Sequence, residues 1–148
     1  MNQTNEKKFP TIEQIQKIET LFGNYPILTG YLFGSQVTGD VNPDSDIDIG
    51  IYFEQTTTQV ERGEFRLRLI VELERIIEIH QVDLVVMNDV PVDLQYEIIS
   101  ANTYLYIRDE SARVAYETQT TSMYFDQKYY IDRHNKKVLE QIAQDGIL

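Results

Sequence analysis

The chain has 148 residues, of which 42% are hydrophobic and 25% charged, the composition of a soluble globular protein. This length predicts one domain, residues 1–148, with a real core. Asp and Glu (24) outnumber Lys and Arg (13), and the net charge of −11 with no basic stripe argues against direct nucleic-acid binding. The absence of cysteine excludes disulfides and thiolate metal ligands.

The sequence carries no targeting or membrane signal that we recognise. Its first residues, "MNQTNEKKF", are polar, and no apolar stretch approaches ~18 residues. We therefore expect a cytoplasmic protein without a membrane partner.

The hydrophobic pattern predicts the element order α-β-β-α-β-α-β-α. The first helix has Thr11 as its N-cap and ends at Gly23. Short apolar or alternating runs predict strands, and longer runs with a helical period predict helices. The strands are expected at 27–34, 46–53, 82–87 and 104–109, and the further helices at 58–78, after Pro91, and from about 111, with a break near 118–121. This order predicts an α/β (α+β) domain, with a mixed sheet of about four strands covered by helices and a helical C-terminal tail.

Acidic residues gather in "YLFGSQVTGDVNPDSDIDIGIYF", residues 31–53. On the strand 46–53, Asp46 and Asp48 point to one face while Ile47 and Ile49 point into the core. Their Cα atoms are roughly 6.5–7 Å apart, so the carboxylates can converge on two cations. Upstream, Gly34 lets a phosphate approach the backbone, and exposed N–H groups with the Ser35 hydroxyl can bind it.

The pattern G-S-x10-D-x-D, formed by Gly34, Ser35, Asp46 and Asp48, resembles that of the DNA polymerase beta-like nucleotidyltransferase superfamily. Within it the chain is most similar to the minimal nucleotidyltransferases (MNT), the antitoxin partners of HEPN ribonuclease toxins. The likeness also includes "QVDLVVM", whose Asp83 corresponds to a third strand carboxylate, and the Tyr-rich tail "YFDQKYYIDRHNK".

The resemblance implies a Mg-dependent enzyme that transfers AMP from ATP to a tyrosine hydroxyl of a HEPN-type toxin and so neutralises it. Gly34 and Ser35 would hold the nucleotide phosphates. Asp46, Asp48 and Asp83 would be the catalytic and metal-binding residues for two Mg²⁺ ions, with Asp83 helping to activate the attacking hydroxyl. A hetero-oligomer with the toxin is expected.

One position departs from the family pattern. Family members commonly have an arginine in a G-S-x-A-R-G sequence, and Thr38 occupies that position here. A triphosphate contact is therefore absent from the motif.

Two other motif matches are weak. Counting from Asp40, the acidic ladder falls on the ligand positions of an EF-hand, but Ser45 replaces the required Gly and Ile51 the bidentate Glu. Arg75 and His80 match the R-x4-6-H pattern of HEPN ribonucleases, but the chain is not an all-helical bundle.

Three functions therefore stay open. The chain is a protein adenylyltransferase, a transferase for a small hydroxylated molecule such as an aminoglycoside, or a non-catalytic antitoxin that acts by contact. The short chain leaves little room for the extra substrate domain of a small-molecule enzyme.

Overall fold

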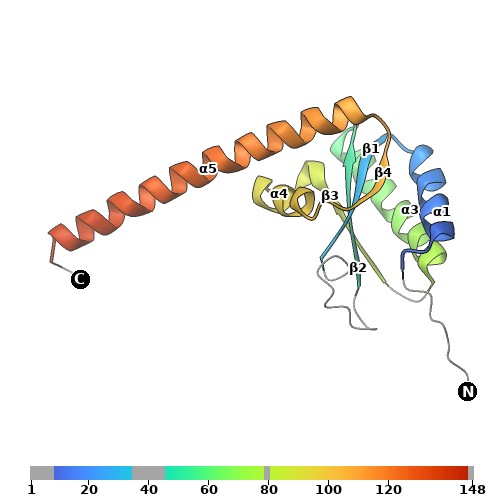
Figure 1. Ribbon diagram of the computed structural model, residues 1–148, viewed down its shortest axis with the longest axis horizontal. Helices are drawn as coiled ribbons and strands as arrows, with labels where there is room; N and C mark the ends of the chain where they lie inside the picture. The colour runs from blue at the N-terminus through green and yellow to red at the C-terminus, as the bar shows by residue number, and fades with distance from the viewer. Residues whose placement is uncertain (1–8, 35–45, 79–80, 147–148) are drawn as a thin grey trace, which may run out of the picture.

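The structure, a computed structural model, describes residues 9–34, 46–78 and 81–146. Its four strands form one mixed sheet in the order β3-β2-β1-β4, with helices on both faces (Figure 1). β1 pairs antiparallel with β2 and β4, and β2 pairs parallel with β3. The elements are α1 (Ile12–Gly23), β1 (Ile27–Phe33), β2 (Ile47–Phe53), α3 (Gln59–Ile77), β3 (Val82–Val86), η1 (Met87–Asp89), α4 (Val92–Ser100), β4 (Tyr104–Ile107) and α5 (Glu110–Gln144). The predicted fold class, element order and mixed sheet are confirmed.

Capping residues in the sequence determine where α1 and α3 begin. Thr11 accepts a hydrogen bond from the backbone N–H of Gln14, whose side chain bonds back to Thr11, and the pair forms a capping box. Thr58 and Glu61 repeat this arrangement at the start of α3. The predicted cap at Thr11 and the predicted end at Gly23 are confirmed.

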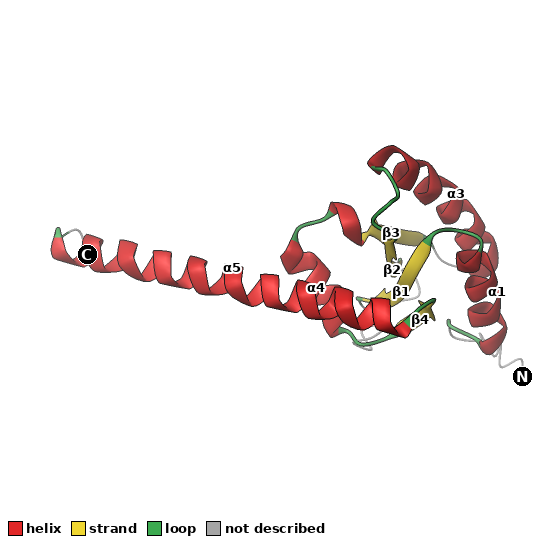
Figure 2. Cartoon of the chain, turned by 90° about the horizontal axis from the view of Figure 1, so that it is seen from above, coloured by secondary structure: helices red, strands yellow, loops and turns green. Residues whose placement is uncertain are grey.

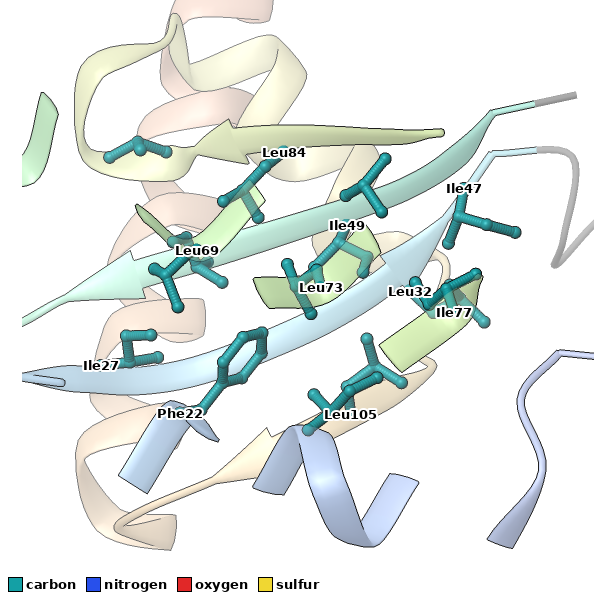
Figure 3. Close-up of a cluster of buried hydrophobic side chains, with 14 of the residues drawn as sticks. Phe22, Ile27, Leu32, Ile47, Ile49, Leu69, Leu73, Ile77, Leu84 and Leu105 are labelled. Carbon is teal, nitrogen blue, oxygen red and sulfur yellow. The ribbon is translucent and has the colours of Figure 1, made fainter. Parts of the chain in front are cut away.

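The main core lies between the sheet and the pair α1 and α3. Alternate residues of β2 point to this face, and Ile47, Ile49 and Ile51 are fully buried there. They pack with Phe22 of α1 and with the row of leucines and Ile77 that α3 presents at helical spacing (Figure 3). This core fixes the outward direction of the intervening β2 side chains, including Asp48.

The opposite face of the sheet carries α4 and the first turns of α5. Ile98 of α4 and Tyr116 of α5 are buried against Tyr31 and Tyr52 of the sheet. Tyr52 and Tyr116 stack with ring centroids 3.6 Å apart, and the Tyr116 hydroxyl donates a 2.6 Å hydrogen bond to Gln95. Both faces of the sheet are therefore covered, as its near-continuous apolar strands require.

The C-terminal helix α5 is continuous, so the break predicted near 118–121 is wrong. β-branched threonines at these positions lower helix propensity, but Thr120 is buried against the domain, and tertiary packing overrides a weak local preference. Tyr124 still stacks on Tyr96 of α4, at 4.0 Å between centroids. Beyond it, residues 125–144 form an outer arm that extends away from the sheet (Figure 2).

In the part of the chain that the structure describes, no helix combines the length and the apolar character needed to cross a membrane.

The stack of Tyr116 on Tyr52 predicts that α5 is anchored at this point. Tyr116→Ala should lower the free energy of unfolding by about 3 kcal/mol, because it removes a buried aromatic side chain. Tyr116→Phe keeps the ring and should cost about 1 kcal/mol for the lost hydrogen bond. Urea unfolding followed by circular dichroism measures both changes.

The matched control is Tyr130→Ala, because Tyr130 lies on the outer arm and is 69% exposed. This change should alter stability by less than about 0.5 kcal/mol. Equal effects of Tyr116→Ala and Tyr130→Ala would contradict the anchoring role.

Candidate functional site

Gly34 and Asp48 meet at the end of β1. Gly34 follows the last residue of β1 and has a φ of 75°, a conformation that glycine adopts without steric cost. A Cβ atom built on Gly34 would lie 2.1 Å from Oδ2 of Asp48. The glycine is therefore required for the Asp48 carboxyl to lie against the backbone. This role is separate from the predicted one, in which Gly34 lets a phosphate approach.

Asp48 and Asp83 lie opposite each other on neighbouring strands. The parallel register of β2 and β3 pairs Asp48 directly with Asp83 and pairs Ile49 with Leu84. Because Ile49 and Leu84 are buried in the core, the two aspartates share the other face of the sheet. The register thus brings together two carboxylates that are 35 positions apart in the sequence.

The environment of Asp48 disfavours its charged form. Burial raises the pKa of Asp48 above its ordinary value, and the negative charges of Asp83 and Asp46 raise it further. Among the residues that the structure describes, the neighbouring charges that shift the pKa of this carboxyl are negative. A cation at this end of the sheet would relieve the repulsion.

The third acid, Asp46, directly precedes β2 and is exposed. These carboxylate oxygens fit Mg²⁺, a hard cation that prefers oxygen ligands, in charge and in ligand type. Over residues 9–34, 46–78 and 81–146, no group of three or more His, Cys, Asp or Glu side chains has the geometry of an ion site. The case for a Mg²⁺ site therefore depends on the pair Asp48 and Asp83. Asp46 lies near enough for its negative charge to raise the pKa of Asp48.

Several predicted residues lie outside the described part of the chain. They are Ser35, the predicted phosphate ligand, Thr38, which replaces the family arginine, most of the acidic ladder, and His80. Arg75, the other half of the ribonuclease-like motif, forms a salt bridge of 3.0 Å with Glu72 on the exposed surface of α3.

The sequence did not point to a cavity that adjoins Asp83. It lies along the outer edge of β3 and has a volume of about 490 Å³. Gly63 and Arg66 of α3 line one side of it, and Val90 and Leu94 line the other. No motif marks these residues, because the cavity exists only once α3 and α4 are packed on either side of β3.

The repulsion around Asp48 predicts that its neutral isostere stabilises the metal-free protein. A raised pKa in the folded state means that ionising Asp48 opposes folding at pH values above that pKa. Asp48→Asn should therefore raise the free energy of unfolding by about 0.5 kcal/mol at pH 7 in EDTA, the scale of a cross-strand charge pair. Chemical unfolding of both proteins measures the difference.

The difference should shrink as the pH falls through the raised pKa of Asp48, because protonation removes the charge that its neighbours repel. Asp126→Asn, on the exposed outer arm, serves as the control and should change stability little. A loss of stability in Asp48→Asn at pH 7 would show that this carboxylate is held by favourable contacts instead.

A family model described as polymerase beta, nucleotidyltransferase matches residues 16–111, which contain Gly34 and all three aspartates. The comparison with curated protein sequences finds no significant match.

Solved structures share the fold. A chain of a toxin–antitoxin complex with AMP-PNP is 23% identical, with 84% of this chain and 98% of that chain covered, at a TM-score of 0.63. A chain of the MntA–HepT toxin–antitoxin complex gives 21% identity, 87% and 99% coverage and a TM-score of 0.63. A third similar chain comes from the complex between a tri-AMPylated Shewanella oneidensis HEPN toxin and an MNT antitoxin. It is 21% identical, with 86% of this chain and 97% of that chain covered, at a TM-score of 0.60.

These likenesses show the nucleotidyltransferase fold, and the family match spans the sheet together with the carboxylates at its end. The chain therefore belongs to the polymerase beta nucleotidyltransferase family.

Proposed function

We propose that this protein is an antitoxin that transfers AMP from ATP to a tyrosine hydroxyl of a HEPN-type toxin. The observation that carries the proposal is that Asp48 and Asp83 lie opposite each other on paired strands, with Gly34 against Asp48, in a chain of the nucleotidyltransferase family. The neighbouring structures support the choice of substrate and partner, since one contains AMP-PNP and another an AMPylated HEPN toxin.

The transfer is a substitution at phosphorus. The phenol oxygen of the acceptor bonds to the α-phosphorus of ATP, the bond from that phosphorus to the bridging oxygen of the β-phosphate breaks, and pyrophosphate leaves. Asp83 takes the proton of the phenol group, which has an unperturbed pKa of about 10. Gly34 and Ser35 bind the nucleotide phosphates in this proposal.

Asp46, Asp48 and Asp83 would hold two Mg²⁺ ions. Bound there, Mg²⁺ would supply positive charge that offsets the charge of the phosphates. Asp48, which lies against Gly34, would place this charge next to the phosphate-binding turn. Removing one carboxylate should therefore stop transfer without disturbing the core on the other face of the sheet.

The outer arm of α5 offers a surface for the partner. A helix with apolar residues on several sides is not stable alone in water and needs a covering surface. The large apolar side chains exposed on this arm are Phe125 (50%), Tyr129 (59%), Tyr130 (69%), Ile131 (57%), Val138 (41%) and Leu139 (57%). In this proposal the toxin covers these side chains. The similar chains of known structure support this choice, because they come from toxin–antitoxin complexes.

AMP transfer is tested by the mass of the partner. The protein is incubated with a candidate HEPN-type partner protein, ATP and Mg²⁺, and the intact mass of the partner is measured. Adducts of AMP mass should appear with wild type and fall by at least about a hundredfold in rate with Asp48→Asn. Glu19→Gln, on the exposed surface of α1, should behave like wild type.

The same experiment separates the enzyme from the two alternatives. If wild type neutralises the partner but adds no mass, the protein acts by contact and the transferase proposal fails. Adducts on an aminoglycoside but none on the protein partner would favour the small-molecule transferase.

The partner surface is tested by placing a charge on the outer arm. Ile131→Asp should weaken partner binding at least about tenfold, because a buried interface does not accept an unpaired carboxylate. Leu67→Asp is the matched control, since Leu67 is also an exposed apolar helix residue (65%) but lies on α3. Calorimetric titration measures both, and equal binding by the two variants would place the interface elsewhere.

A further inference from the structure

The cavity beside Asp83 lies at the outer edge of β3. β3 is the terminal strand of the sheet, and its outer edge lies between α3 and α4 (Figure 2). The cavity runs along this edge and includes Asp83 itself among its lining residues. It is therefore continuous with the carboxylate end of the sheet.

The backbone of this edge is already partly occupied by side chains of α3. Arg66 donates from Nε to the carbonyl oxygen of Leu84 at 2.8 Å, and Glu74 accepts from the backbone N–H of Val82 at 3.3 Å. An additional β-strand would have to displace both bonds. The cavity is thus suited to a side chain entering it, and not to a strand extending the sheet.

The lining favours a neutral group with an apolar body and a polar end. Val85, Val90 and Leu94 are partly exposed and form apolar walls, while Asp83 offers an exposed carboxylate at one end. A phenol has this character, with an apolar ring and a hydroxyl that donates a hydrogen bond. The volume of about 490 Å³ leaves room for one aromatic side chain.

The charges of the cavity disfavour a nucleotide there. Among the described residues, Asp83 and Asp89 line it together with one cation, Arg66, and Asp89 also binds Arg62, at 2.6 Å. Arg62 also donates to the carbonyl oxygen of Thr57. A polyphosphate would meet two carboxylates against the single cation, Arg66, of the described lining, whereas a phenol adds no charge.

We propose that this cavity is the acceptor site, which receives the tyrosine side chain of the protein substrate and directs its hydroxyl to Asp83. The inference rests on the proposed adenylyl transfer, in which that oxygen bonds to the α-phosphorus, pyrophosphate leaves and Asp83 takes the proton. It assigns to the edge of β3 a role in selecting the acceptor that is separate from partner binding by α5.

The test uses two glycines in matched settings. Gly63 of α3 lines the cavity, and Gly23 of α1 does not; both are exposed helical residues whose added Cβ would meet no atom within 4 Å. Gly63→Leu places a side chain at the cavity, while Gly23→Leu makes the same change elsewhere. Because leucine has a higher helix propensity than glycine, both variants should fold.

The probe is N-acetyl-tyrosinamide, titrated into the ATP-free protein and followed by methyl NMR, which detects millimolar binding. Wild type should show shifts of the Val85, Val90 and Leu94 methyl groups that N-acetyl-alaninamide does not cause. Gly63→Leu should weaken this binding at least about tenfold, and Gly23→Leu should not change it. Binding of AMP-PNP with Mg²⁺ should be equal in all three proteins.

Absence of these shifts in wild type, or equal probe binding by the two variants, would overturn the acceptor site. Loss of AMP-PNP binding in Gly63→Leu alone would overturn it too, since the nucleotide would then occupy the cavity. Probe binding is measured without catalysis, so the cavity can hold tyrosine while the partner gains no AMP mass. In that case the transferase proposal fails and the binding site stands.

Discussion

The parallel pairing of β2 with β3 is the constraint on which the candidate site depends. It places Asp48 opposite Asp83, and a shift of β3 by one residue would turn the Asp83 side chain toward the apolar core. The core prevents this shift, because Ile47 and Ile49 of β2 and Leu84 of β3 are fully or almost fully buried on the other face. The free energy of hydrophobic burial thus holds together carboxylates that repel each other.

Gly34 adds a second constraint at the same point. Its left-handed backbone and missing side chain allow the Asp48 carboxyl to approach the end of β1. A site of this kind is less stable without a ligand than a neutral one would be, which is common where a protein retains charge for function. The cost is small relative to the burial provided by α1 and α3.

The sequence predicted most of the fold because periodicity and capping signals agree along the chain. Thr11 marks the start of α1, and alternation marks β2. The family resemblance indicated Asp83 as a strand carboxylate, and the register of β2 and β3 places it opposite Asp48. The continuity of α5 was not predictable, since Thr120 disfavours a helix locally and only its burial against the domain compensates.

The cavity at the edge of β3 was beyond sequence reasoning for a different reason. Gly63 and Leu94 come from helices that do not adjoin in sequence, and their approach depends on how each packs against the sheet. The individual residues carry no chemical signature, since glycine and leucine are common in helices. A motif identifies reacting groups, whereas the surfaces that select a substrate arise from packing.

The proposed activity assigns separate tasks to three parts of one small chain. The carboxylate end of the sheet would bind nucleotide and metal, the edge of β3 would receive the acceptor, and the outer arm of α5 would hold the partner. The outer arm is joined to the sheet by the first turns of α5. There Tyr116 stacks on Tyr52, and Arg113 donates to the Tyr104 hydroxyl at 2.8 Å. On this proposal, partner binding and chemistry should respond to different substitutions.

The most direct measurement for the central claim is the melting temperature with and without Mg²⁺ or Mn²⁺. A cation that binds the folded protein alone stabilises it, so wild type should melt at a higher temperature as the metal concentration rises. The variant carrying both Asp46→Asn and Asp48→Asn should show no such increase. An increase that survives in the double variant, or is absent from wild type, would contradict a metal site at the carboxylate end of the sheet.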